Sequence, residues 1–121
     1  MNLREMTITL NRLEGIFFET YIEALHFTER GDADASDDPE LDETFLRESL
    51  IDCLAFYSRV GCYLADNHVA IAGLDFWHCR NGIETSVRER KVFGWAKQNA
   101  ERFTKLAEGF GEVDALFEES I

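Results

Sequence analysis

Basic side chains are scarce in this 121-residue chain: 12 lysines and arginines stand against 24 aspartates and glutamates, a formal net charge of −12. A surface with this charge repels a phosphate backbone, which argues against direct binding of DNA or RNA. The apolar runs are only a few residues long, too short for a transmembrane helix, and residues 1–5 lack the apolar stretch of a signal peptide. We therefore expect a cytoplasmic protein that binds neither nucleic acid nor a membrane.

Cysteine is also sparse, and its pattern carries no disulfide or zinc signature. Cys53, Cys62 and Cys79 are odd in number, include no C-x-x-C pair and match no zinc spacing with the three histidines. We expect reduced, mostly buried thiols. The serines lack a G-x-S-x-G setting, and there is no glycine-rich phosphate loop. The sequence therefore predicts no enzyme, no cofactor and no metal site.

The apolar residues, 45% of the chain, suffice for one core, so we predict a single domain over residues 1–121. Apolar positions recur with helical spacing over residues 9–28, 42–66 and 91–108. Asn11 is the expected N-cap of the first helix, with Glu14 at the acidic position of a capping box.

Between the second and third predicted helices the apolar period changes to two. Residues 74–80 alternate, Asn81-Gly82 is typical of a type I′ turn, and residues 83–89 alternate again, so we predict a β-hairpin. A lone hairpin needs a further partner, and residues 112–118 can supply a third strand. The predicted fold class is α+β, with three helices packed on a small antiparallel sheet made of the hairpin and the C-terminal strand.

Charge is unevenly distributed along the chain. Residues 29–48 contain nine acidic and two basic residues, and residues 108–121 contain five acidic residues and no base. Residues 80–105 contain seven basic and three acidic residues. In one interpretation the basic segment, as a solvated helix face, partly neutralises the two acidic blocks within the fold. In the other, the acidic blocks form a surface that binds a partner.

The segment Asp75-Phe76-Trp77-x-x-Arg80-Asn81-Gly82 resembles a family of small acidic proteins of unknown function from bacteriophages and related mobile elements. The likeness extends more loosely to residues 17–25, 72–73 and 105–111. Ile83-Glu84 stands where that family has His-Gly, and its following Gly-Phe-Trp-Asp segment is missing here. The resemblance implies a phage genome and the cytoplasm of a host cell as the setting, and it implies no activity.

Two segments are candidate sites. Asp75, Trp77, Arg80 and Asn81 could form a polar site at the mouth of the hairpin. The structural alternative is that Asp75 pairs with Arg80 or caps a turn, that Trp77 fills the core and that Asn81-Gly82 makes the bend.

The second candidate site has the ligand spacing of a calcium loop, with oxygen-bearing side chains at Asp32, Asp34, Ser36, Asp38, Glu40 and Glu43. Asp37 occupies the position of the turn glycine, and Pro39 lacks the N–H that a paired loop uses. These departures favour a solvated acidic loop over a metal site.

Together these features predict a non-enzymatic, acidic, phage-type protein that binds and inhibits a host defence protein by imitating nucleic acid. The partner would have a basic nucleic-acid-binding surface, and the residues predicted to contact it are Asp32, Asp34, Asp37, Asp38, Glu40, Asp42 and Glu43. One alternative is a structural or regulatory phage protein, possibly a homodimer, that uses an apolar patch with Phe18, Phe27, Phe56 and Trp95. The other alternative is a module that responds to a divalent metal.

Overall fold

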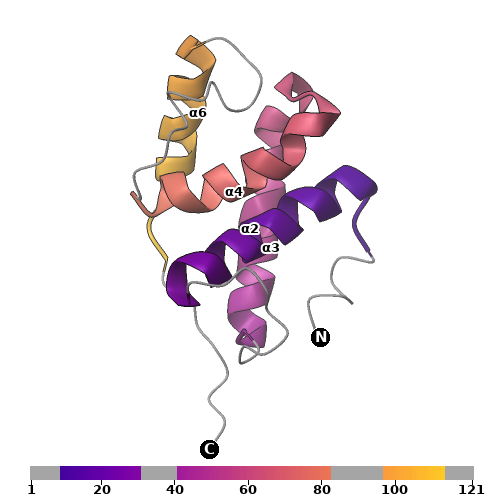
Figure 1. Cartoon of the computed structure of the whole chain (residues 1–121), viewed down its shortest axis with the longest axis vertical. Helices are drawn as coiled ribbons and strands as arrows, with labels where there is room; N and C mark the ends of the chain where they lie inside the picture. Colours follow the sequence, from indigo (N-terminus) through magenta and orange to yellow (C-terminus); the bar gives the residue numbers. More distant parts are fainter. Residues whose placement is uncertain (1–8, 31–40, 83–96, 114–121) are drawn as a thin grey trace, which may run out of the picture.

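The structure is a computed structural model that describes residues 9–30, 41–82 and 97–113. Within these ranges the chain forms four α-helices, two short 3-10 helices and no β-strand. In chain order the elements are α2 (Arg12–Arg30), α3 (Glu43–Val60), η2 (Gly61–Tyr63), η3 (Asp66–His68), α4 (Val69–Arg80) and α6 (Lys97–Glu108). Helix α4 packs against both α2 and α6, and α3 packs against the same two helices (Figure 1).

The predicted α+β fold is wrong, because the first strand of the predicted hairpin is helical. Residues 74–80 belong to α4, and the φ angle of Asn81 is −97°, whereas a type I′ turn needs positive φ at both central residues. Gly82, with a φ of 66°, instead ends the helix, and its N–H donates a hydrogen bond to the Cys79 carbonyl at 3.3 Å. The helix was missed because α4 is buried on several sides, which erases the 3.6-residue period.

The other predicted strands find no support in the described residues. Residues 83–89 lie outside them, and of residues 112–118 only Glu112 and Val113 are described, neither of them in a strand.

The described helix ends agree with the predictions at the capping box of α2 and at Glu108 of α6, and they depart most at the end of α3. The capping box is confirmed: the Asn11 N–H donates to Oε1 of Glu14 at 3.0 Å, and the Glu14 N–H donates to Oδ1 of Asn11 at 2.8 Å. The second helix, expected over 42–66, ends at Val60. Two short 3-10 helices, η2 and η3, follow it. Of the third, expected over 91–108, the described part begins at α6.

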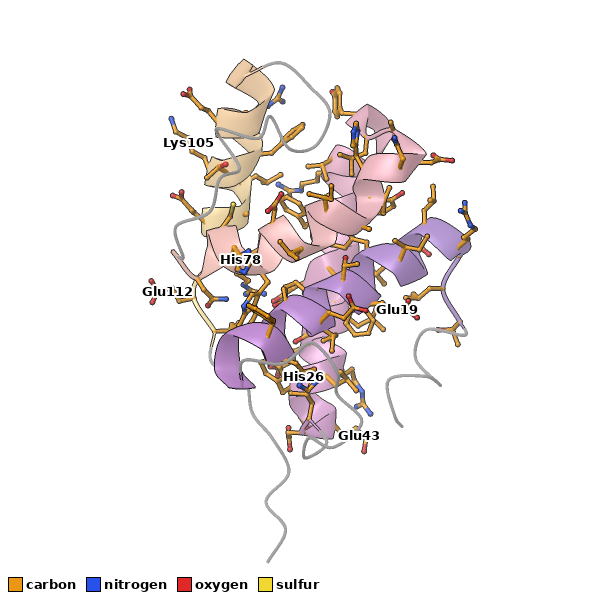
Figure 2. All side chains as sticks on the ribbon, in the orientation of Figure 1. Glu19, His26, Glu43, His78, Lys105 and Glu112 are labelled. Carbon is orange, nitrogen blue, oxygen red and sulfur yellow. The ribbon has the colours of Figure 1, made fainter. Side chains whose placement is uncertain are left out.

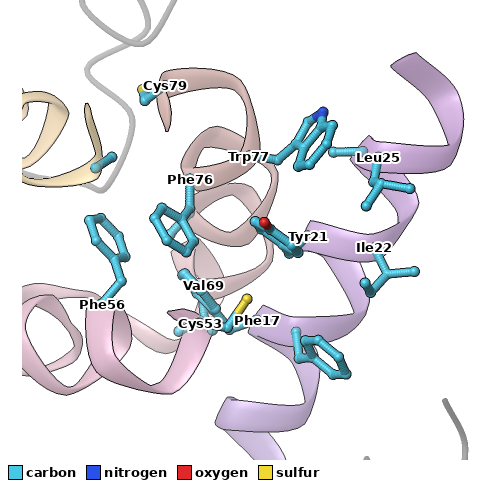
Figure 3. Packing of buried hydrophobic residues seen from close by; sticks show 14 of the residues in the cluster. Phe17, Tyr21, Ile22, Leu25, Cys53, Phe56, Val69, Phe76, Trp77 and Cys79 are labelled. Atoms are coloured by element: carbon cyan, nitrogen blue, oxygen red, sulfur yellow. The ribbon is translucent and has the colours of Figure 1, made fainter. Parts of the chain in front are cut away.

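Aromatic rings form the centre of the core. Phe56 of α3 and Phe76 of α4 stack with 4.3 Å between ring centroids, and Tyr21 of α2 meets Trp77 edge to face at 5.5 Å. Figure 3 shows Tyr21 directed from α2 towards Phe76 and Trp77 of α4. Trp77 is 1% exposed, which agrees with the structural alternative in which it fills the core.

Gly73 sets how closely α2 and α4 approach each other. A Cβ atom at this position would overlap the Phe17 carbonyl oxygen and the Thr20 hydroxyl of α2. The Thr20 hydroxyl cannot easily move, because it donates to the carbonyls of Ile16 and Phe17, each at 3.1 Å. The crossing therefore requires a residue without a side chain.

We predict that Gly73→Ala destabilises the protein by about 2 kcal/mol or more, because the two helix backbones must separate and this outweighs the better helix propensity of alanine. Gly15→Ala is the matched control: Gly15 also lies in a helix, but an added Cβ meets nothing within 4 Å. This variant should be stabilised by up to about 1 kcal/mol. Urea denaturation measures both changes, and equal stability of the two variants would contradict the close crossing.

Candidate functional site

Arg80, the last residue of α4, is buried, with 3% of its surface exposed. Its Nη1 donates to the Tyr21 hydroxyl at 3.1 Å and to Oδ2 of Asp52 at 2.9 Å. Its Nε donates to the Gly111 carbonyl at 2.9 Å, and its Nη2 donates to the Phe110 carbonyl at 3.1 Å. Each of the three guanidinium nitrogens therefore has an acceptor, which is the condition under which a buried charge is tolerated.

These bonds join four parts of the fold at one side chain. Tyr21 lies on α2, Asp52 on α3 and Arg80 on α4, while Phe110 and Gly111 follow α6. The Asp52 side chain is 33% exposed, so water solvates one side of the ion pair. The carboxylate that pairs with Arg80 thus comes from α3, and sequence analysis did not identify it.

Aromatic rings and burial complete the surroundings of Arg80. Its Cζ lies 5.4 Å from the centroid of the Phe76 ring and 5.9 Å from that of Phe110, within the range of cation–π attraction. Burial raises the pKa of the Tyr21 hydroxyl and that of the nearby Cys53 thiol, and the positive charge of Arg80 offsets only part of the rise. Both groups therefore stay protonated at neutral pH, which does not suit either to nucleophilic chemistry.

Asn81 connects the end of α4 to the segment that follows α6. Its Nδ2 donates to the Trp77 carbonyl at 2.9 Å, and its Oδ1 accepts from the Val113 N–H at 2.8 Å. The side chain thus satisfies one free carbonyl at the helix C-terminus and holds a second segment against it.

The four predicted hairpin residues lie on one helix and its C-terminal cap, and the hydrogen bond from Asn81 to the Trp77 carbonyl is the contact shown among them. Asp75, Trp77 and Arg80 are buried and Asn81 is half-buried, and they belong to α4 and its C-terminal cap. The mouth of a hairpin is therefore the wrong location for them. Trp77 packs in the core, Arg80 bonds to neighbouring elements and Asn81 caps α4, so structural roles account for most of the distinctive residues over 75–82.

The acidic candidate site lies only partly within the described residues. Asp42 is the N-cap of α3, where its Oδ2 accepts from the Phe45 N–H at 3.0 Å. Glu43 is exposed at the lower end of α3 in Figure 2, and its Oε1 accepts from Nη2 of Arg47 at 3.1 Å. The remaining predicted residues, Asp32, Asp34, Asp37, Asp38 and Glu40, lie outside the described ranges, as does Ser36 of the calcium pattern.

The described ranges contain no group of three or more histidine, cysteine, aspartate or glutamate side chains that could hold a metal ion.

The predicted apolar patch is not a single surface. Phe18 and Phe56 are completely buried, Phe27 is 60% exposed, and Trp95 lies outside the described residues. The large apolar side chains that are exposed in the described part of the chain belong to four different elements; they are Phe27, Ile51, Tyr63 and Ile71.

Comparisons with known protein families, with curated proteins and with solved structures find no match for this chain. None of the helices in the described part is both long enough and apolar enough to cross a membrane.

Arg80→Met should lower the free energy of unfolding by about 3–5 kcal/mol, because Asp52 and two backbone carbonyls lose their charged donor in a mostly buried place. Tyr21→Phe should cost only about 1 kcal/mol, since Nη1 of Arg80 keeps its bond to Asp52. Urea denaturation gives both values. A wild-type stability for Arg80→Met would show that the arginine does not hold these elements together.

We predict that one thiol of the native protein reacts quickly with a disulfide reagent. Cys62 is exposed, whereas Cys53 and Cys79 are buried, and none of the three is in a disulfide. The fast reaction should disappear in Cys62→Ser, and two further thiols should react only after denaturation. Fast reaction of two thiols in the native wild-type protein would contradict this burial pattern.

Proposed function

We propose that the protein is a non-enzymatic binding protein that uses an acidic surface to occupy the basic nucleic-acid-binding surface of a partner protein. The observation that carries the proposal is the excess of nine acidic over two basic residues within residues 29–48. Six of the nine acidic residues lie in the stretch of chain between Arg30, the last residue of α2, and Glu43, the first residue of α3.

Two further exposed carboxylates lie on α2, outside the acidic segment, and are not part of the proposed binding surface. Glu19 and Glu23 lie four residues apart, on one face of that helix, and both are exposed. Not all acidic residues are available to a partner. Asp42 caps α3 and Glu43 pairs with Arg47, so both also have local structural roles. The residues on which binding most depends are therefore Asp32, Asp34, Asp37, Asp38 and Glu40.

The physical basis of binding would be long-range attraction followed by replacement of phosphate groups with carboxylates. A strongly charged surface raises the rate at which an oppositely charged partner is captured, and the attraction falls steeply as salt is added. A nucleic acid bound at the same basic surface would then be displaced.

The resemblance of residues 75–82 to small acidic bacteriophage proteins supports a bacterial defence protein as the partner and host cytoplasm as the location. The resemblance supplies this setting only, since the contacts of Trp77, Arg80 and Asn81 described above are those of packing and capping.

We predict that the immobilised protein captures a basic nucleic-acid-binding protein from a bacterial host lysate at low salt. Capture should be lost at about 0.5 M salt, where the Debye length shrinks to a few ångströms. Replacing Asp32, Asp34, Asp37, Asp38 and Glu40 with Asn or Gln should reduce capture about tenfold or more, and mass spectrometry identifies the captured protein. Addition of the free acidic protein should release labelled nucleic acid from that partner.

The matched control neutralises five exposed acidic residues elsewhere in the described structure: Glu19, Glu23, Asp66, Glu101 and Glu108. This variant has the same net charge as the test variant and should retain most of the capture. Asp42 is left unchanged in both, because loss of this N-cap would destabilise α3 by about 1 kcal/mol and confuse the result. Equal loss of capture in both variants would show that capture depends on net charge alone and not on the acidic segment, which would contradict the proposal. Capture that persists at high salt would also overturn it.

A further inference from the structure

The face of α3 that points away from the core carries a regular stripe of exposed side chains. The stripe follows alternating steps of four and three residues and consists of Thr44, Glu48, Ile51, Ala55, Ser58 and Cys62, the last in η2. The opposite face supplies the core with Phe45, Cys53, Phe56 and Val60. The alternating step is the spacing with which one helix presents a continuous seam to another helix.

Ile51 stands at the middle of this stripe and is 60% exposed. Its neighbours along the stripe towards the C-terminus are small, Ala55 and Ser58, so another helix backbone can approach closely there. A large apolar side chain next to a small one forms a knob and a hole on the same surface. Antiparallel pairing of two such surfaces sets the large side chain of each against the small one of the other, whereas parallel pairing sets like against like.

We propose that this outer face of α3, which we call the α3 seam, binds the α3 seam of a second copy of the chain in antiparallel orientation. A two-fold axis between Ile51 and Ala55 places Ile51 of one protomer against Ala55 of its partner, and the reverse. The same axis places Glu48 opposite Ser58 and Thr44 opposite Cys62. Each of the six residues of the seam then lies opposite another residue of the seam.

Charge also favours the antiparallel arrangement over the parallel one. Glu48 lies in the N-terminal half of α3 and the exposed Arg59 in its last turn, so two-fold pairing places Glu48 of one protomer within one residue of the level of Arg59 of its partner. Parallel pairing would instead bring Glu48 against Glu48 and Arg59 against Arg59. Opposite charges across a helix pair select orientation in this way.

The net charge of −12 opposes any association of two copies, and the antiparallel arrangement limits this cost. The acidic start of α3, with Asp42 and Glu43, lies at one end of an 18-residue helix. With the axis at residue 53, Glu43 of one protomer lies about 20 residues along the pair from Glu43 of its partner, about 30 Å at about 1.5 Å per residue, well beyond the Debye length of about 8 Å at physiological salt. The dimer should therefore depend only weakly on salt, whereas the acidic binding proposed above should weaken steeply as salt is added.

Cross-linking tests the orientation directly. Thr44→Cys introduces a second exposed thiol, which in the antiparallel dimer lies opposite the native Cys62 of its partner. The two thiols of one chain are too far apart along α3 to react with each other, so mild oxidation should yield a covalent dimer that a reductant dissociates. Thr44→Ser, with Cys62 alone, should stay monomeric on a non-reducing gel. A covalent dimer formed through Cys62 alone would indicate parallel pairing and overturn the proposal.

Sedimentation equilibrium tests the seam itself. One helix face is a small interface, so we expect a micromolar dimer that is measurable at protein concentrations up to roughly 300 µM. Ile51→Glu should weaken the dimer about tenfold or more by placing two charges at the centre of the seam. Ile71→Glu is the matched control, since Ile71 is also exposed but lies on α4, and it should leave the dimer unchanged. A monomeric wild type over this range, or equal effects of the two substitutions, would overturn the proposal.

Discussion

The guanidinium of Arg80 is bonded to α2, to α3 and to the segment after α6 from its own position at the end of α4. A buried positive charge needs acceptors to offset its lost hydration, and here they come from separate elements, so the arginine makes the positions of the helices depend on one another. The aromatic rings of Phe76 and Phe110 beside the guanidinium connect the same centre to the apolar core. Asn81 and Gly82 then end α4 where the Arg80 bonds require it to end.

This centre changes how the segment over residues 75–82 is interpreted. In the sequence these residues resemble those of a binding site, because arginine and tryptophan are enriched among the residues that dominate binding. In the structure Arg80 donates hydrogen bonds to carbonyls, a hydroxyl and a carboxylate of the chain itself. Asn81 donates to one carbonyl and accepts from one backbone N–H. The residues with which we associate function are instead charged or exposed ones, in the acidic segment and on the α3 seam.

The local prediction of the capping box agreed with the structure, whereas the local turn signal at Asn81-Gly82 and the predicted setting of Arg80 did not, because distant contacts decide both. The capping box of α2 involves residues three positions apart, so its pattern is complete in the sequence. Asn81-Gly82 is equally local, but Gly82 with positive φ can end a helix as well as turn a hairpin, and only the packing of α4 decides between them. The partners of Arg80 could not be found at all, since Asp52 is 28 residues away and Tyr21 is 59.

By itself the sequence determined the charge of the protein, the start of α2 and the presence of enough apolar residues for one core, because these follow from composition and short-range hydrogen bonds. Tertiary structure decided that residues 74–80 are helical, that Arg80 is a buried centre and that Ile51 remains exposed on α3. The reason is physical. A segment buried on several sides loses the pattern that distinguishes helix from strand, and a charge enters the core only where distant acceptors meet it.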